Sequence, residues 1–158
     1  MVRPIDMISR SGDAGLHISP QAKALKLELV SVSPSEAIIK LPYRLELVGE
    51  PDSGILAGGA VTTLLDHVCG QAVWAALDEF MSIVTLDLRI DYTRPAKPGL
   101  DLFAHAHCYK LTRSVAFVRA AAYETDRSDP VSTAQAAFML TRLQIQPTPD
   151  QIRAAVSR

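Results

Sequence analysis

One carboxylate, Asp66, lies inside an otherwise apolar stretch and is the residue best suited to chemistry. The stretch from 58 to 77 predicts one long helix with apolar residues on all sides, so the helix should be buried. A carboxylate there costs free energy unless it is paired, hydrated or protonated. Carboxylates held in such places are candidates for acid–base or nucleophilic catalysis. The alternative is a structural Asp66 that hydrogen-bonds a neighbouring loop.

Hydrophobic periodicity predicts the elements that would position this helix. Alternating apolar and polar residues indicate two strands, over 25–32 and 37–41, which should form a hairpin. After the helix, the same pattern and short polar turns predict four further strands, over 82–92, 101–111, 115–125 and 131–143. Glycines and a proline limit residues 1–22 to a loose arm or a short helix. A tail over 144–158 could hold a short helix from Gln151, and the whole chain, 1–158, is expected to be one domain.

The order of elements predicts an α+β fold in which the helix covers one face of a sheet of about six strands. The short loops between the last four strands require an antiparallel meander, and a long apolar helix laid across the sheet would cover its apolar face. The small residues of 116–123 suggest that this strand lies beneath the helix. In the strand 82–92, alternation assigns two faces: Val84, Leu86, Leu88, Ile90 and Tyr92 on one, and Thr85, Asp87, Arg89 and Asp91 on the other.

Composition excludes several classes of function. Hydrophobic residues make up 48% of the chain, charged residues 21%, and the net charge is -1, which favours neither nucleic acid nor an anionic membrane. There is no membrane-spanning apolar run and no signal-peptide pattern at the start. Cys69 and Cys108 fall in predicted core elements. We therefore expect a cytoplasmic protein with reduced cysteines.

Two runs of residues resemble the signature of a known family. The first is Gly54-Ile55-Leu56-Ala57-Gly58-Gly59 with Leu64-Leu65-Asp66 and Gly70, and the second is Thr85-Leu86-Asp87-Leu88-Arg89-Ile90-Asp91-Tyr92-Thr93-Arg94-Pro95-Ala96. Together they resemble the hotdog-fold acyl-CoA thioesterases of the phenylacetyl-CoA thioesterase-like (PaaI-like) branch. The likeness covers roughly residues 45–143 and matches the predicted order of elements.

The resemblance implies a curved antiparallel sheet wrapped around a central helix and an active site between two subunits. Members are homodimers or dimers of dimers, so a homodimer and possibly a homotetramer are expected. In this family a backbone N–H at the helix start, here of Gly58 or Gly59, polarises the thioester carbonyl. The family's carboxylate, which acts as general base or nucleophile, falls on Asp66, and its supporting strand hydroxyl falls on Thr85.

The residues themselves fit this mechanism. Glycines let a carbonyl approach the free N–H groups of a helix start, whose dipole favours an oxyanion. Gly58 and Asp66 are eight residues apart, or roughly 12 Å along a helix, so one carbonyl cannot touch both. Antiparallel pairing of two such helices would bring Gly58 of one subunit near Asp66 of the other.

Two positions depart from the family pattern. The family's helix-start His is replaced by Ala57, and an Asn six residues earlier is replaced by Pro51, beside Asp52. These departures bear on the placement of water and on the level of activity. They leave open a second function, a non-catalytic acyl-CoA binding or sensor subunit. A hydratase on the same fold lacks its expected motif here, and a purely structural oligomer conflicts with the buried charge.

A CoA substrate requires cations for its phosphates. The candidates are Arg94 and Lys97 after one strand and Arg113 with Ser114 in a tight turn, with Arg127 the weaker choice; each could equally be a solvated surface residue. No dinucleotide, Walker or zinc motif is present, so neither a cofactor nor a metal is expected.

The remaining polar and aromatic residues have structural readings that compete with functional ones. His67 points away from Asp66 around the helix and is expected to be a packing or interface residue. Thr62 and Thr63 could bond Asp66 or preceding backbone carbonyls. His105 and His107 share a strand face but lack a third metal ligand, which favours a solvent or interface face. Trp74 and Phe80 could belong to the core or to a pocket wall.

Overall fold

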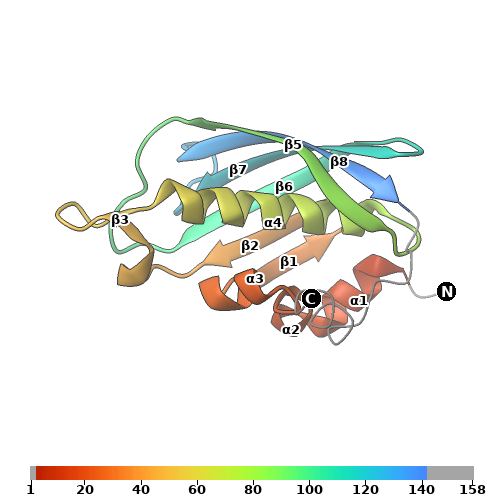
Figure 1. Ribbon diagram of the computed structural model, residues 1–158, viewed down its shortest axis with the longest axis horizontal. Helices are drawn as coiled ribbons and strands as arrows, with labels where there is room; N and C mark the ends of the chain where they lie inside the picture. The colour runs from red at the N-terminus through yellow and green to blue at the C-terminus, as the bar shows by residue number, and fades with distance from the viewer. Residues whose placement is uncertain (1–2, 142–158) are drawn as a thin grey trace, which may run out of the picture.

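The computed structural model describes residues 3–141, which form a six-stranded antiparallel sheet curved around one long helix (Figure 1). The sheet order is β1-β2-β6-β7-β8-β5, and a separate hairpin pairs β3 with β4. The strands are β1 (Glu28–Ser33), β2 (Glu36–Leu41), β3 (Val48–Glu50), β4 (Ile55–Leu56), β5 (Ser82–Tyr92), β6 (Leu102–Leu111), β7 (Val115–Tyr123) and β8 (Ser132–Thr141). The six predicted strands are confirmed, while the predicted tail over 144–158 lies outside the described residues.

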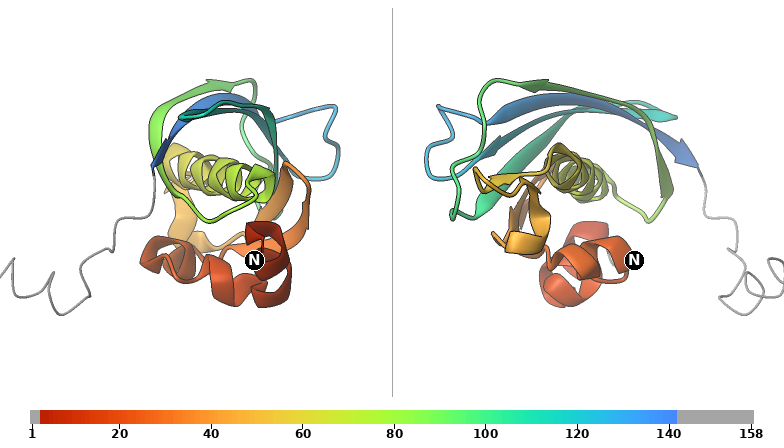
Figure 2. Two further views of the ribbon diagram at one scale, coloured as in Figure 1. Left: turned by 90° about the vertical axis from the view of Figure 1, so that its right-hand side faces the viewer. Right: turned by 60° about the vertical axis from the view of Figure 1, so that its left-hand side comes forward.

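The long helix α4 (Gly58–Ala76) lies in the concave side of the sheet, as two end-on views show (Figure 2). Leu64, Leu65 and Val68 are fully buried in the core. The sheet offers a surface of small side chains to the helix, with Ala104, Ala106, Ala116, Ala120 and Ala122 all buried. The prediction that the alanine-rich strand lies under the helix is therefore confirmed.

One narrow side of α4 stays uncovered within the chain. Gly58, Gly59 and Thr62 are exposed and Asp66 is half-buried, whereas the residues on the other sides of the helix are mostly buried. Thr62 follows Gly58 by four residues and Gly59 by three, and Asp66 follows Thr62 by four, so they lie along one side of the helix. The predicted all-round burial of α4 holds except along this line.

A β-bulge in β5 changes which side chains of the strand face α4. Thr85 pairs with Phe138 and Asp87 with Ala137, so Leu86 is an extra residue in the strand. Val84 and Leu86 are 47% and 55% exposed, while Leu88 and Ile90 pack against the core. The predicted common face for these residues is wrong: the extra residue reverses the alternation, so Thr85 and Leu88 both face inward.

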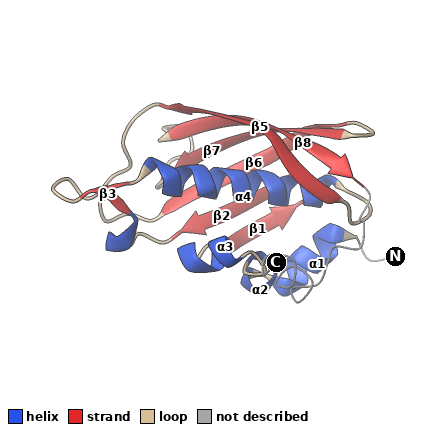
Figure 3. Cartoon of the chain, viewed as in Figure 1, coloured by secondary structure: helices blue, strands red, loops and turns tan. Residues whose placement is uncertain are grey.

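Three short helices precede the sheet: α1 (Pro4–Ser11), α2 (Asp13–Leu16) and α3 (Pro20–Leu25) (Figure 3). Figure 2 shows them on the side of α4 that the sheet leaves open. Asp13 Oδ1 accepts a hydrogen bond from the Leu29 amide at 2.6 Å, and His17 Nε2–H donates to the Leu27 carbonyl at 2.7 Å. The segment is therefore tied to β1, and is more ordered than the predicted arm or single short helix.

The strand predicted from Leu25 begins later than expected. Lys26 takes the left-handed conformation, with φ 53°, and ends α3, so that β1 starts at Glu28. The loop predicted between the second strand and the long helix also holds a short 3-10 helix, η1 (Leu45–Leu47).

Both cysteines are free and buried in the core. Burial raises the pKa of the Cys69 and Cys108 thiols, so both remain protonated packing residues. Within residues 3–141 there is no helix long and apolar enough to cross a membrane.

Candidate active site

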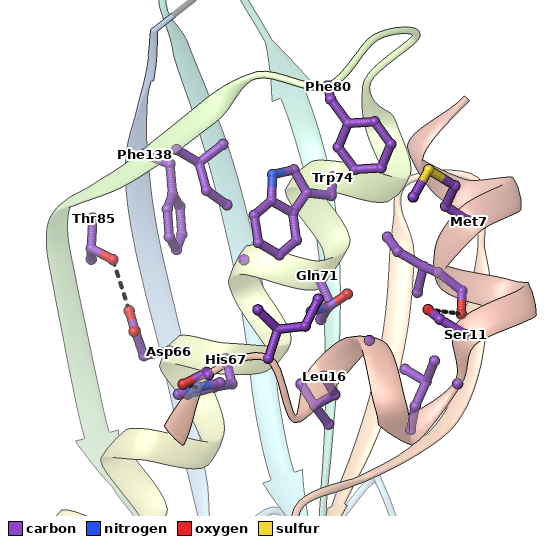
Figure 4. Close-up of a pocket in the computed structure, with 18 residues that line it drawn as sticks. Met7, Ser11, Leu16, Asp66, His67, Gln71, Trp74, Phe80, Thr85 and Phe138 are labelled. Carbon is purple, nitrogen blue, oxygen red and sulfur yellow. Dashed lines mark hydrogen bonds between the residues drawn. The ribbon is translucent and has the colours of Figure 1, made fainter. Parts of the chain in front are cut away.

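Asp66 on α4 and Thr85 on β5 form a hydrogen-bonded pair. The Thr85 hydroxyl donates to Asp66 Oδ1 at 2.9 Å, and Figure 4 shows the two side chains pointing toward each other. The bulge in β5 lies directly beside Thr85, and bulges commonly redirect side chains next to functional sites. The carboxylate is therefore paired with a neutral hydroxyl, and no cation among residues 3–141 forms an ion pair with it.

The start of α4 leaves backbone donors free. The N-cap residue, Ala57, makes no side-chain cap, so the first N–H groups have no partner of the kind that Ser or Asp would supply. A methyl group added to Gly59 would meet no atom within 4 Å, and both Gly58 and Gly59 are exposed. The backbone at Gly59 therefore borders open space into which a carbonyl oxygen can come, whereas a methyl group on Gly58 would lie 3.5 Å from Tyr92 Oη.

The helix start is also held from the sheet side. Tyr92 Oη donates to the Gly58 carbonyl at 3.0 Å and lies 3.1 Å from the Thr62 hydroxyl. Thr63 Oγ1 donates to the Gly59 carbonyl at 2.9 Å. Thr63 thus follows the second of its two readings, a bond to a preceding backbone carbonyl, whereas Thr62 pairs with the Tyr92 hydroxyl and follows neither.

Asp66 and Thr85 lie at one end of a cavity of about 460 Å³ beneath the N-terminal helices. This volume is within the range of small-molecule sites, about 300–1,000 Å³. Its walls are mainly apolar, with Trp74, Phe80 and Phe138 among the side chains drawn in Figure 4. Trp74 and Phe80 are thus pocket-wall residues, a distinction that the sequence could not make.

His67 takes a structural position beside this cavity. Its Nδ1–H donates to the Thr63 carbonyl at 3.0 Å, and Nε2 lies 3.3 Å from the Ser19 hydroxyl. The ring therefore links α4 to the start of α3, which agrees with the predicted packing role.

Arg94 is engaged in an internal ion pair. Its guanidinium donates to both carboxylate oxygens of Glu124, at 2.9 and 2.5 Å, and it also lies 3.2 Å from Asp129. The Lys97 amide donates to Glu124 as well, at 2.8 Å. The Arg94 guanidinium, opposed by burial and helped by the Lys97 amide, lowers the pKa of Glu124 to about 2. The Lys97 side chain is exposed.

The predicted phosphate contacts fall into two separate places. Arg94 and Lys97 follow β5, whose last residue, Tyr92, contacts the start of α4. Arg113 and Ser114 lie in the exposed β6–β7 turn, where the Ser114 carbonyl accepts from the Leu140 amide, opposite the first residues of β5. Figure 1 shows these two loops at opposite ends of α4. The structure does not bring the four residues together within one chain.

Other predicted positions lie away from the cavity. Pro51 and Asp52 are exposed in the β3–β4 turn. His105 is buried on the strand, where burial lowers its pKa, while His107 is exposed. Among residues 3–141, no group of three or more His, Cys, Asp or Glu side chains is placed to hold a metal ion.

Three residues of the site were missed at the sequence level: Tyr92, Glu124 and Gln71. Tyr92 belongs to the strand motif and was placed on the face of Leu88 and Ile90, but no pattern in the sequence pairs it with the helix start. Glu124 and Gln71 carry no spacing signal, because their partners and surroundings come from distant parts of the chain.

Comparison with known proteins agrees with this arrangement. Residues 53–130 match the family model of the thioesterase superfamily. Human acyl-coenzyme A thioesterase 13 is 32% identical over 92 residues, which cover 58% of this chain and 64% of that protein. The chain therefore matches less than two thirds of the length of such curated relatives.

Solved structures are similar over more of the chain. A Pseudomonas aeruginosa protein is 38% identical, with a TM-score of 0.72 over 78% of this chain and 92% of that one. A mutant of the phenylacetic acid degradation protein PaaI from Thermus thermophilus is 25% identical, with a TM-score of 0.68 over 79% and 100%.

A curved antiparallel sheet closed around one long helix, with an acidic residue midway along that helix, defines a hotdog fold. The chain belongs to the thioesterase superfamily, as its two sequence motifs predicted.

Proposed function

We propose that this protein hydrolyses an acyl-CoA thioester to the free acid and CoA. The observation that carries the proposal is the Asp66–Thr85 pair at one end of an apolar cavity. The acyl group would occupy the cavity, and its thioester would lie beside the carboxylate. The superfamily membership and the similarity to acyl-coenzyme A thioesterase 13 support this choice of reaction.

Asp66 acts as the general base or the nucleophile of this proposal. While the Thr85 hydroxyl donates its hydrogen bond to Oδ1, its oxygen can still accept a hydrogen bond from water. In the base mechanism, Asp66 takes a proton from water as oxygen attacks the thioester carbon. The C–S bond then breaks, and the CoA thiolate takes up the proton.

The Gly58 and Gly59 amides of the same chain lie too far from Asp66 to hold the oxyanion of this reaction. Eight residues separate Asp66 from Gly58, roughly 12 Å along α4. We therefore place the Gly58 or Gly59 amide of a second copy beside the thioester carbonyl. Two features support such a homodimer: the exposed line on α4, and the outer edge of β5, which has no partner strand among the described residues and where Val84 and Leu86 are exposed.

Contacts to the CoA phosphates are proposed from the exposed cations. Arg94 holds Glu124, so its proposed part is to fix the loop that presents Lys97. Arg113 and Ser114 offer a second anchor at the other end of α4. Separate Lys97→Ala and Arg113→Ala variants distinguish them. Loss of the residue that contacts the phosphates should raise KM and leave kcat nearly unchanged.

The direct test measures release of free CoA thiol from a panel of acyl-CoAs. We expect Asp66→Asn to lower kcat by roughly 10²–10⁴-fold, the usual contribution of a positioned general base. Asp78→Asn, an exposed carboxylate after α4, is the matched control and should retain full activity. Equal rates for wild type and Asp66→Asn would refute the proposal.

One observation favours a second function, acyl-CoA binding without turnover. Ala57, at the position of the family's helix-start His, offers no side-chain hydrogen bond. Tight binding of acyl-CoA by the wild type, with no CoA release from any member of the panel, would support the binding protein.

A further inference from the structure

The cavity beside Asp66 has a wall that lies outside the matched family segment. Residues of α1 and α2, among them Met7 and Leu16, close it opposite α4, whereas the family match covers only residues 53–130. The wall is fixed in place by the Asp13–Leu29, His17–Leu27 and Ser19–His67 hydrogen bonds. Part of the cavity wall is therefore made by residues that precede the matched segment.

One polar side chain in this apolar space has an unsatisfied oxygen. Gln71 is 6% exposed, lines the cavity, and its Oε1 has no hydrogen-bond partner among residues 3–141. A buried amide without a partner costs free energy, and Leu or Met would fill the same place without that cost. An unpaired polar group in a ligand cavity is accounted for when the ligand supplies the partner.

The position of Gln71 relative to Asp66 defines where that partner would be. The two residues are five apart, or roughly 7.5 Å along the axis of α4. Gln71 lies on the helix side of His67 and Trp74, which faces the N-terminal helices, and Figure 4 shows it between Asp66 and Ser11. An acyl chain that starts at Asp66 would therefore reach Gln71 several bonds beyond its carbonyl.

We infer that Gln71 is a specificity-determining residue, which hydrogen-bonds a hydroxyl group carried by the acyl chain several carbons from the thioester. The inference rests on the proposed function, because it takes the cavity as the acyl site. The rest of the acyl group is hydrocarbon, in keeping with the apolar side chains of the walls. A hydroxyl can donate to the amide oxygen, whereas an unsubstituted chain leaves that oxygen unpaired.

The chain contains its own probe for this site. Trp74 is the only tryptophan, and it lines the cavity, so its fluorescence reports occupancy without any need for turnover. The ligands are octanamide and a series of hydroxyoctanamides with the hydroxyl at carbons four to eight. These amides keep the carbonyl, are not thioesters, and carry no charge for Asp66 to repel.

We expect one position of the hydroxyl to bind the wild type about five- to tenfold tighter than octanamide, the worth of one good hydrogen bond. In Gln71→Leu this preference should disappear, while octanamide itself binds equally well or better. Gln135→Leu, on the exposed outer side of β8, is the matched control and should keep the wild-type ratio.

Three results would overturn the inference: no hydroxyl position preferred by the wild type, the same preference in Gln71→Leu, or no tryptophan response to any amide. The wild-type series alone remains decisive if Gln71→Leu does not fold, and Gln71→Met then replaces it. Loss or retention of CoA release in Asp66→Asn is measured separately, so this inference and the proposed function can fail independently.

Discussion

Thr85 has a single hydroxyl proton, which it donates to Asp66, and this fixes what its replacement should do. Thr85→Ala removes the donor and leaves one carboxylate oxygen free to rotate away from the attacking water. We expect kcat to fall about 10–100-fold, the effect of losing a hydrogen bond to a charged group. Thr85→Ser keeps the hydroxyl and should recover most of the rate. A steady-state assay of CoA release checks both, and equal rates for Ala and Ser would show that the hydroxyl is not needed.

Glu124 joins two loops through Arg94 and the Lys97 amide, so its removal is predicted to destabilise the fold. Glu124→Gln leaves Arg94 with a missing charge partner and should lower the free energy of unfolding at pH 7 by about 2–3 kcal/mol, less than for a fully buried pair because Arg94 is partly exposed. Urea denaturation provides the measurement. Glu46→Gln, at an exposed carboxylate, should change little.

The same pair predicts a pH dependence with a definite sign. Arg94, as the largest cause, lowers the folded-state pKa of Glu124 to about 2, from an ordinary 4.5. The stabilisation is therefore complete above pH 4.5 and is lost as the pH falls toward 2. The stability gap between wild type and Glu124→Gln should narrow over that interval. A gap that stays constant down to pH 2 would contradict the assignment.

Part of the candidate site could be predicted from residue types and spacing. Asp66 stood out because a charge in an apolar helix is costly, and Thr85 entered through the family motif; the structure brings these two together. Gln71 gave no such signal, because a glutamine in a helix is ordinary until the neighbouring segment buries it. Arg94 was singled out for its charge alone, and its partner Glu124 lies thirty residues away.

At the scale of elements, a substitution at the start of α4 should affect the stability of the fold and the rate of catalysis in different ways. A methyl group at Gly59 meets no atom of residues 3–141 within 4 Å, and Ala favours helix over Gly by about 1 kcal/mol, reduced at a helix end. Gly59→Ala should therefore keep or slightly raise the melting temperature. Its methyl would occupy the space of the reacting carbonyl, so kcat/KM should fall about 10²-fold or more.

A melting curve and a CoA-release assay on the same Gly59→Ala sample test both halves of this expectation. Unchanged kcat/KM would mean that the open space beside Gly59 receives no carbonyl. A large loss of stability would mean that the residue is constrained by contacts beyond the single chain.

Periodicity predicted the elements well and their faces less well. The helix expected over 58–77 is observed at Gly58–Ala76, and the six strands agree within a few residues. The bulge at Leu86 could not be foreseen, since Val84, Leu86, Leu88, Ile90 and Tyr92 fit a regular alternation. The extra residue shows only in the pairing with β8, a long-range property of the sheet.

For the whole molecule, the decisive question is whether one site uses two chains. Asp66→Asn and Gly59→Val should each be inactive as homodimers. In a mixed dimer, the intact Asp66 of one chain would face the intact Gly59 of the other, which restores one site. Co-expression in equal amounts should therefore recover about a quarter of the wild-type activity, by random pairing of a two-fold dimer.

Differently tagged subunits allow the mixed dimer to be purified and its CoA release measured. The control is a homodimer in which each chain carries both Asp66→Asn and Gly59→Val, since pairing of that double variant with itself restores no site. Failure of the mixed dimer to exceed either parent would place the oxyanion donors elsewhere.

The overall architecture followed from the sequence because one apolar helix and six strands leave few ways to cover a sheet. The N-terminal helices were not foreseen as part of the cavity. Each is short and weakly patterned alone, and their order depends on hydrogen bonds to β1 and α4 that only the folded chain supplies.

α1 and α2 line the cavity without taking part in the Asp66–Thr85 pair, so the wall of the cavity and the candidate catalytic pair come from different parts of the chain. Substitutions in those two short helices can change the shape of the cavity while the Asp66–Thr85 pair stays intact. Under the proposed function, we therefore expect the acyl group that is preferred to differ among related proteins more readily than the reaction itself.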